Sequence, residues 1–223
     1  MASVMSRTLT ECFQILLSHG ANPHYKDAMG RGALHLACEN GHLQAVKSLI
    51  EAGVPVDSQG EPCRYTGLTN SGTTDAEDVA SFLLREGANI NHVTTLGFTA
   101  LTNATARNSH ACTRLFLERG ANYLHVPRYD GSTLLHYAAA GGDLETMDIL
   151  AAHGLRGLDV SLKNNAGMTA LQCFHSRSDV SPEPRDGFAR LLDAVCGGKD
   201  DDEDEDVFFD ALESQDLTAR GGG

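Results

Sequence analysis

The chain has 223 residues, of which 41% are hydrophobic and 21% are charged, and these ordinary values for a globular protein exclude disorder of the whole chain. The net charge is -13, but ten acidic and only two basic residues lie from Lys199 onward, which leaves 20 acidic and 15 basic residues in the rest. Because an acidic surface repels phosphate backbones, nucleic acid is not expected as a partner.

Cysteine spacing and the first residues of the chain indicate a compartment. The six cysteines include no C-x-x-C pair, and most fall in helical patterns where a small apolar residue would serve. Neither a zinc site nor a disulfide framework is therefore predicted. Residues 1–10 lack the apolar run of a signal peptide, and no stretch reaches the ~18 consecutive apolar residues of a membrane span. We expect a reduced, intracellular protein of the cytoplasm, with the nucleus as a second location, and no membrane partner.

A period of 33 or 34 residues runs through the chain. A glycine follows an apolar, helix-like run at Gly20, Gly53, Gly87, Gly120 and Gly154. A second landmark begins 12 to 15 residues after each of these glycines. Its versions are GALHLA from Gly32, TGLTNS from Thr66, FTALTNA around Thr99, TLLHYA from Thr133 and TALQCF from Thr169. Two landmarks that recur in register predict a chain of stacked repeats.

These landmarks resemble the signature G-x-T-P-L-H-x-A of the ankyrin-repeat family, over roughly residues 1–195. The resemblance implies an all-α solenoid of about five helix-turn-helix repeats with finger loops and an incomplete first repeat. The repeat domain is expected at 1–196, in repeats at about 1–26, 27–60, 61–93, 94–127, 128–163 and 164–196. The family pattern also implies that the motif threonine caps the first helix. His35 and His136 would hydrogen-bond within their repeats, with Thr69, Thr102 and Gln172 replacing them elsewhere.

The apolar pattern agrees with this architecture. In residues 33–51, apolar positions recur at helical spacing and are split by Glu39-Asn40-Gly41-His42, which predicts two short antiparallel helices. One such pair buries too little to stand alone, so neighbouring pairs must stack. The glycine after each second helix fits a left-handed C-cap, and residues 88–97 are predicted to form a hairpin-like finger.

Three repeats depart from the pattern. The second helix of the first repeat, at 11–18, has no complete first helix before it, so this end is either an imperfect cap or a surface that contacts another subunit. The next finger has Arg64 in place of its glycine, and Gly72 lowers helix propensity by roughly 1 kcal/mol, so this repeat is expected to be the softest. In the last repeat, Pro182 and Pro184 predict a surface loop between the helices.

The resemblance also implies where a partner binds. Ankyrin partners commonly contact the finger tips and the exposed side of each first helix, which together form the concave face. By register, the expected binding residues on the tips are Met29, Arg31, Arg64, Tyr65, Leu96, Phe98, Arg128, Tyr129 and Met168. The helix edge would carry Glu39, Asn40, Thr73, Thr74, Arg107 and Arg177. Arginine and aromatic residues are enriched at interface hot spots, which favours this row as a binding surface for a partner protein. Arginines gathered on the concave face of a mildly acidic body suggest that the partner presents an acidic segment. Scattered surface ion pairs are the alternative explanation of the arginines.

Residues 197–223 form an acidic tail with seven successive acids at 200–206. Self-repulsion among these charges predicts disorder. Apolar residues at 207–209, 211 and 212 are interleaved with Asp210 and Glu213, a pattern typical of a short amphipathic helix that docks on a partner. One hypothesis is that the tail folds back on the arginine-bearing face and competes with a ligand.

No catalytic residues, cofactor or metal are predicted. The sequence contains no G-x-S-x-G, no H-E-x-x-H and no dinucleotide fingerprint, and Gly197-Gly198-Lys199 lacks the rest of a P-loop. The expected function is a non-catalytic protein–protein interaction module that acts as an adaptor, scaffold or inhibitor. The alternative is a regulatory subunit of a transcriptional or ubiquitin-pathway complex, or an accessory protein of a metabolic pathway.

Overall fold

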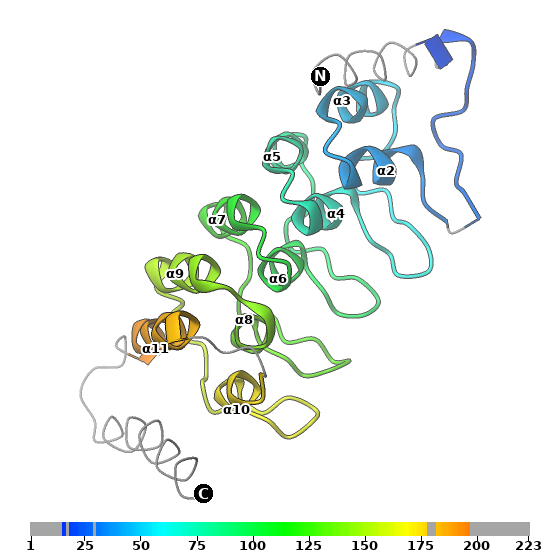
Figure 1. The fold of residues 1–223 in the computed structure, drawn as a ribbon. Helices are drawn as coiled ribbons and strands as arrows, with labels where there is room; N and C mark the ends of the chain where they lie inside the picture. Colours follow the sequence, from blue (N-terminus) through cyan, green and yellow to red (C-terminus); the bar gives the residue numbers. More distant parts are fainter. Residues whose placement is uncertain (1–14, 17, 29, 178–181, 197–223) are drawn as a thin grey trace, which may run out of the picture.

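Two rows of helices make up the computed structural model, which describes residues 15, 16, 18–28, 30–177 and 182–196 (Figure 1). The inner row, next to the finger loops, contains α2 (Ala33–Glu39), α4 (Gly67–Thr74), α6 (Ala100–Ala106), α8 (Leu134–Gly141) and α10 (Ala170–His175). The outer row contains α3 (Leu43–Glu51), α5 (Glu77–Arg85), α7 (His110–Glu118), α9 (Leu144–His153) and α11 (Pro182–Cys196). The predicted all-α solenoid is confirmed, and most of its incomplete first repeat lies outside the described residues.

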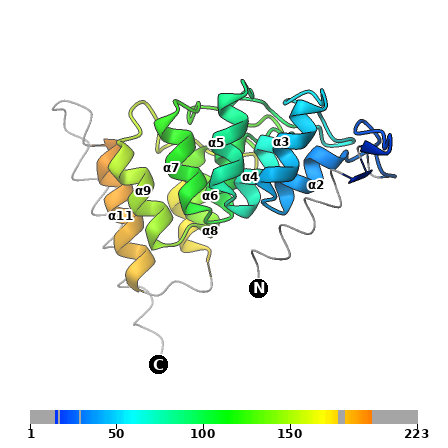
Figure 2. The same ribbon diagram turned by 90° about the horizontal axis from the view of Figure 1, so that it is seen from above.

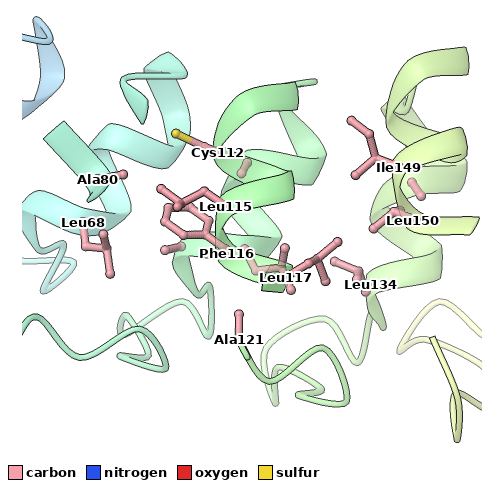
Figure 3. Packing of buried hydrophobic residues seen from close by; sticks show 14 of the residues in the cluster. Leu68, Ala80, Cys112, Leu115, Phe116, Leu117, Ala121, Leu134, Ile149 and Leu150 are labelled. Carbon is pink, nitrogen blue, oxygen red and sulfur yellow. The ribbon is translucent and has the colours of Figure 1, made fainter. Parts of the chain in front are cut away.

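One continuous core runs through the stack because each repeat covers the next. Within the rows, α4 contacts α2 and α6, and α7 contacts α5 and α9. Figure 2 shows the outer helices side by side. Phe116 of α7 is fully buried and points toward Leu68 and Ala80 of the preceding repeat, while Leu117 faces Leu134 of the following one (Figure 3). Neighbouring repeats therefore share each layer of the core, as expected of helix pairs that cannot fold alone.

Each inner helix begins with a cap in which the side chain three positions later accepts from the N–H of the N-cap residue. Thr66 Oγ1 accepts from the backbone N–H of Thr69 at 3.3 Å, and Thr69 Oγ1 accepts from the N–H of Thr66 at 2.6 Å. The same reciprocal pairing joins Thr99 to Thr102 and Thr169 to Gln172, whereas at Thr133 and Gly32 only the return bond is present, from their own N–H to Nδ1 of His136 and His35. The capping role expected of the motif threonine is confirmed at Thr66, Thr99 and Thr169, and that of the residue three positions later is confirmed at every inner helix.

Residues with a left-handed backbone end the outer helices and form the finger turns. Gly53, Gly87 and Gly120 have φ of +86°, +89° and +76°, so the predicted C-cap conformation is confirmed. The finger turns use a second glycine, as at Gly97, whose φ is +87°. Arg64 takes φ +57° at the corresponding position, so this finger keeps its turn although its residue carries a Cβ.

Helix breakers in two repeats lie inside helices. Gly72 does not interrupt α4: it is buried, and a Cβ at this position would lie 2.8 Å from the carbonyl oxygen of Ala100 in α6. The expected softness of this repeat stays a prediction. The loop expected around Pro182 and Pro184 was wrong, because both prolines belong to the first turn of α11. Proline is tolerated there since the first N–H groups of a helix have no intrahelical acceptor.

Candidate functional site

The base of each finger places one residue in a common register on the inner row. These residues stand directly before the inner-helix caps and are Arg31, Tyr65, Phe98, Ser132 and Met168. Ser132 is buried, and the other four are partly exposed. Figure 1 shows that the fingers lie next to the inner helices all along the stack.

Phe98 contacts the inner helix of the following repeat. Its ring centroid lies 5.7 Å from that of Tyr137 in α8, with the two rings tilted by 54°. The Tyr137 hydroxyl donates to Asp130 Oδ2 at 2.9 Å, and burial, with Asp130 adding to the effect, raises the pKa of Tyr137. Tyr137 is therefore a neutral phenol at neutral pH, with its ring half-exposed and its hydroxyl fixed.

Tyr65 occupies the register position of Phe98 one repeat earlier. Burial raises the pKa of Tyr65, Cys63 adds to the rise, and the positive charge of Arg107 opposes it. Arg107 is the exposed C-cap residue of α6, and its positive charge acts on the Tyr65 phenol of the preceding finger. We call Tyr65, Phe98, Arg107 and Tyr137 the central patch. It joins an arginine to three aromatic rings across three consecutive repeats.

Arg31, Arg177 and Met168 are engaged within the protein. Arg31 Nε lies 3.0 Å from Asp27 Oδ2, and its Nη1 lies 3.7 Å from Glu39 Oε2, so two carboxylates neutralise it. Arg177 donates to the Gly142 carbonyl at 2.9 Å at the end of α8, and its guanidinium lies 5.7 Å from the ring of Phe174. Met168 packs against the core. The structure therefore gives these three predicted binding residues structural contacts.

The remaining predicted residues lie along the fingers. Arg128 and Tyr129 are exposed, and Tyr129 is 73% exposed, so both are open to a partner. Arg64 is exposed and donates from Nε to Gln59 Oε1 at 2.6 Å. Leu96 is half-buried in its finger turn. Met29 lies outside the described residues.

Tyr137 was missed by the sequence analysis. It directly follows the motif histidine in TLLHYA, at the inner-helix position that Leu36, Asn70 and Asn103 occupy in the other repeats. A helical projection of each repeat would have placed this position on the exposed side of the first helix. The contact with Phe98 depends on stacking of the next repeat, which the single repeat does not display.

Four histidines join successive repeats through one kind of hydrogen bond. A ring Nε2 meets a finger carbonyl at each junction: His35 with Tyr65 at 3.0 Å, His92 with Arg64 at 2.8 Å, His125 with Gly97 at 3.0 Å and His136 with Met168 at 3.0 Å. The motif histidines thus bond between repeats as well as within them. Where threonine replaces the motif histidine, a finger histidine makes the bond instead.

The described residues contain neither a group of three or more His, Cys, Asp or Glu side chains that could hold a metal nor a helix long and apolar enough to cross a bilayer. The cysteines at 38, 63, 112 and 173 are free thiols. Burial raises the pKa of Cys38 to about 12, as expected for a thiol that packs as a small apolar residue. The features that can recognise a partner protein are the row of residues at the bases of the fingers and the central patch.

The family model for ankyrin repeats in three copies matches residues 1–91 and 70–164. The chain belongs to the ankyrin-repeat family. It is 33% identical over 173 residues to the human B-cell lymphoma 3 protein, a match that covers 76% of this chain and 37% of that protein. The mouse homologue is 32% identical, with 76% and 38% covered. Human ankyrin repeat domain-containing protein 63 is 37% identical over 90 residues, which are 39% of this chain and 23% of that protein.

Family membership agrees with the resemblance that the two sequence landmarks carry. Ankyrin repeats form protein–protein interaction modules and are typically non-catalytic, so the chain is a protein-interaction module. The chain spans less than two-fifths of the length of the B-cell lymphoma 3 proteins that it matches.

Proposed function

We propose that the chain binds a partner protein through its concave face, with the central patch as the main contact, and that it acts as an adaptor, scaffold or inhibitor. The observation that carries the proposal is the grouping of Tyr65, Phe98, Arg107 and Tyr137 across α4, α6 and α8. Tyrosine and arginine dominate the residues whose loss weakens interfaces most, and such residues cluster near the centre of an interface. The stack holds these side chains before binding, which lowers the entropy lost on association.

Arg107 gives the proposal its charge preference. Within the described residues, neither Arg107 nor Arg128 forms a salt bridge, whereas Arg31, Arg114 and Arg190 do. An arginine without an internal carboxylate is available to a carboxylate of a partner, and it binds one with two parallel hydrogen bonds. The proposed partner therefore presents an acidic segment, and we propose the cytoplasm, with the nucleus as a second location, as the place of binding.

The test is capture of partners from native cytosol with the full chain, followed by affinity measurement on the captured protein. Arg107→Glu should weaken binding at least about tenfold, the loss typical of an interface hot spot. Arg119→Glu is the matched control, because Arg119 is likewise the exposed C-cap residue of a helix but ends α7 in the outer row. Equal affinities of the two variants would contradict the proposal.

The aromatic half of the patch is tested in the same assay. Phe98→Ala should lose binding, and Tyr25→Ala should not, because Tyr25 is 72% exposed on the first finger, away from the patch. The identity of the captured protein then decides between a transcriptional complex, a ubiquitin-pathway complex and a metabolic pathway.

A further inference from the structure

We infer that the central patch has an occupant within the chain, the acidic and aromatic segment 200–212 of the tail, which covers the patch until a partner displaces it. The inference rests on the proposed function, because it assigns the same surface an internal competitor. Its chemistry comes from the sequence of the segment, DDDEDEDVFFDAL, in which seven successive acids precede two phenylalanines and an eighth acid follows them. The patch carries the complementary groups, one arginine and three aromatic rings.

The direction of α11 brings the start of the tail to the finger side of the stack. A Cβ at Gly187 would contact Leu144 and Met147 at the start of α9, and Arg190 pairs with Asp148 at 2.7 Å. Later residues of α11 thus contact later residues of α9, so the two helices run parallel. Because α9 ends where the finger of the last repeat begins, Cys196 at the end of α11 also lies at the finger side of the stack.

The tail is long enough to reach the patch. Sixteen residues lie from 197 to 212, and at ~3.3 Å per residue they span at most about 50 Å. Neighbouring helices pack ~10 Å apart, so α6 lies about 20 Å from α10 along the inner row. The reach exceeds this separation by enough for the acids to pass Arg128 and end at Arg107.

Charge favours the end of α6 over the corresponding ends of α2 and α4. A groove at the ends of α2 and α4 is lined by Glu39, Asp75, Glu77 and Asp78, which repel an acidic segment, whereas the end of α6 carries Arg107. On the inner face, Arg107 and Arg128 form no salt bridge within the described residues. The acids of the segment therefore lie over these two arginines, and Phe208 and Phe209 follow onto the rings of Phe98 and Tyr137, where edge-to-face and offset contacts are favourable.

The chain contains no tryptophan, so a single tryptophan introduced at the patch reports on its cover alone. The experiment places this reporter in the full chain by Phe98→Trp and measures how readily acrylamide quenches its fluorescence. A second full chain has the seven acids of 200–206 replaced by the matching amides. The expected result is a shielded tryptophan in the first protein and an accessible one in the second. High salt should expose the first reporter as well, because charge attraction is screened.

Two controls separate tail cover from other causes. Tyr25→Trp places a reporter on the first finger, and its quenching should not change when the acids are neutralised. A synthetic peptide of residues 197–213, added to the neutralised chain, should shield the Phe98→Trp reporter again, and Arg107→Glu should abolish this effect. Tyr137→Trp repeats the measurement if Phe98→Trp lowers the unfolding temperature.

Equal quenching of the patch reporter in the acidic and neutralised chains would overturn the inference. Shielding that persists without the acids would overturn it too, because the cover would then not depend on charge. Neither result touches the partner assay, in which Arg107→Glu and Arg119→Glu are compared. Failure of the tail inference and failure of the proposed function are therefore distinguishable.

Discussion

At the scale of single residues, His35 combines a cap with a link between repeats. Its Nδ1 accepts from the Gly32 N–H at 3.1 Å, and its Nε2 lies 3.0 Å from the Tyr65 carbonyl oxygen, which can only accept. The two bonds require the neutral imidazole with its proton on Nε2. Burial, with Lys26 adding to the effect, lowers the pKa of His35, although backbone hydrogen bonds oppose the shift.

The lowered pKa predicts a loss of stability in acid. A group whose pKa is lower in the folded than in the unfolded protein stabilises the fold above its unfolded pKa, about 6.5 for histidine. This contribution is lost as the pH falls through the folded pKa. Urea unfolding between about pH 7.5 and pH 5.5 should therefore show a falling midpoint.

His35→Gln is the matched variant for this prediction. Gln172 already serves as cap acceptor at the last inner helix, where its Oε1 accepts from the Thr169 N–H at 3.0 Å. Glutamine does not titrate, so the variant should lose less stability than the wild type over the same pH range. Parallel pH profiles of the two proteins would show that His35 does not carry the effect.

At the scale of elements, Gly72 shows close packing of two inner helices prevailing over local preference. Glycine costs roughly 1 kcal/mol in a helix relative to alanine, and the position still forms part of α4. A Cβ there would meet the Ala100 carbonyl oxygen at 2.8 Å and the ring of Phe116 at 3.1 Å. The glycine allows α4, α6 and α7 to approach one another.

Gly72→Ala should therefore destabilise the protein although it favours the helix. Overpacking typically costs about 1–3 kcal/mol, which exceeds the gain in propensity of roughly 1 kcal/mol. Gly141→Ala is the control, since Gly141 is helical and exposed and a Cβ there finds only an ordinary contact of 3.6 Å. Urea unfolding should show a loss of stability for the first variant and none for the second; a gain for Gly72→Ala would mean that α6 can move away at little cost.

At the scale of the whole molecule, stability is a sum of repeats and of the junctions between them. Phe116 is fully buried at such a junction, and its ring lies against α4 as well as within its own repeat. Phe116→Ala should cost about 3–5 kcal/mol by leaving a cavity. Hydrogen exchange should then increase most in α4 to α9 and least in α11, because each repeat contacts only its neighbours.

Phe82→Ala is the comparison for this variant. Phe82 is half-buried on α5, and the ammonium of Lys47 lies 5.7 Å from its ring centroid. Its removal should cost clearly less stability, because it leaves no closed cavity at a junction. A uniform increase of exchange over the whole stack in Phe116→Ala would contradict the view of the solenoid as separable junctions.

The period of the sequence determined the local structure of this protein. Gly53, Gly87 and Gly120 marked the helix ends, and the motif threonines marked the helix starts, because caps depend on residues that are near in the chain. The sequence also placed the residues at the finger bases and at the inner-helix ends in a common register. Tyr65, Phe98 and Arg107 were therefore predicted on the concave face.

Only the tertiary structure decided which of those residues are available to a partner. Register placed Arg31 and Arg177 on the concave face, as it did Arg107. In the structure, two carboxylates bind the guanidinium of Arg31, and Arg177 donates to the carbonyl at the end of α8. Tyr137 joined the patch through a ring contact from another repeat. The contacts of Arg177 and Tyr137 link residues about one repeat or more apart, and they depend on how closely neighbouring helix pairs stack, which no pattern within a single repeat contains. The two carboxylates that hold Arg31 belong to its own repeat, and their side-chain geometry is likewise set by the folded structure.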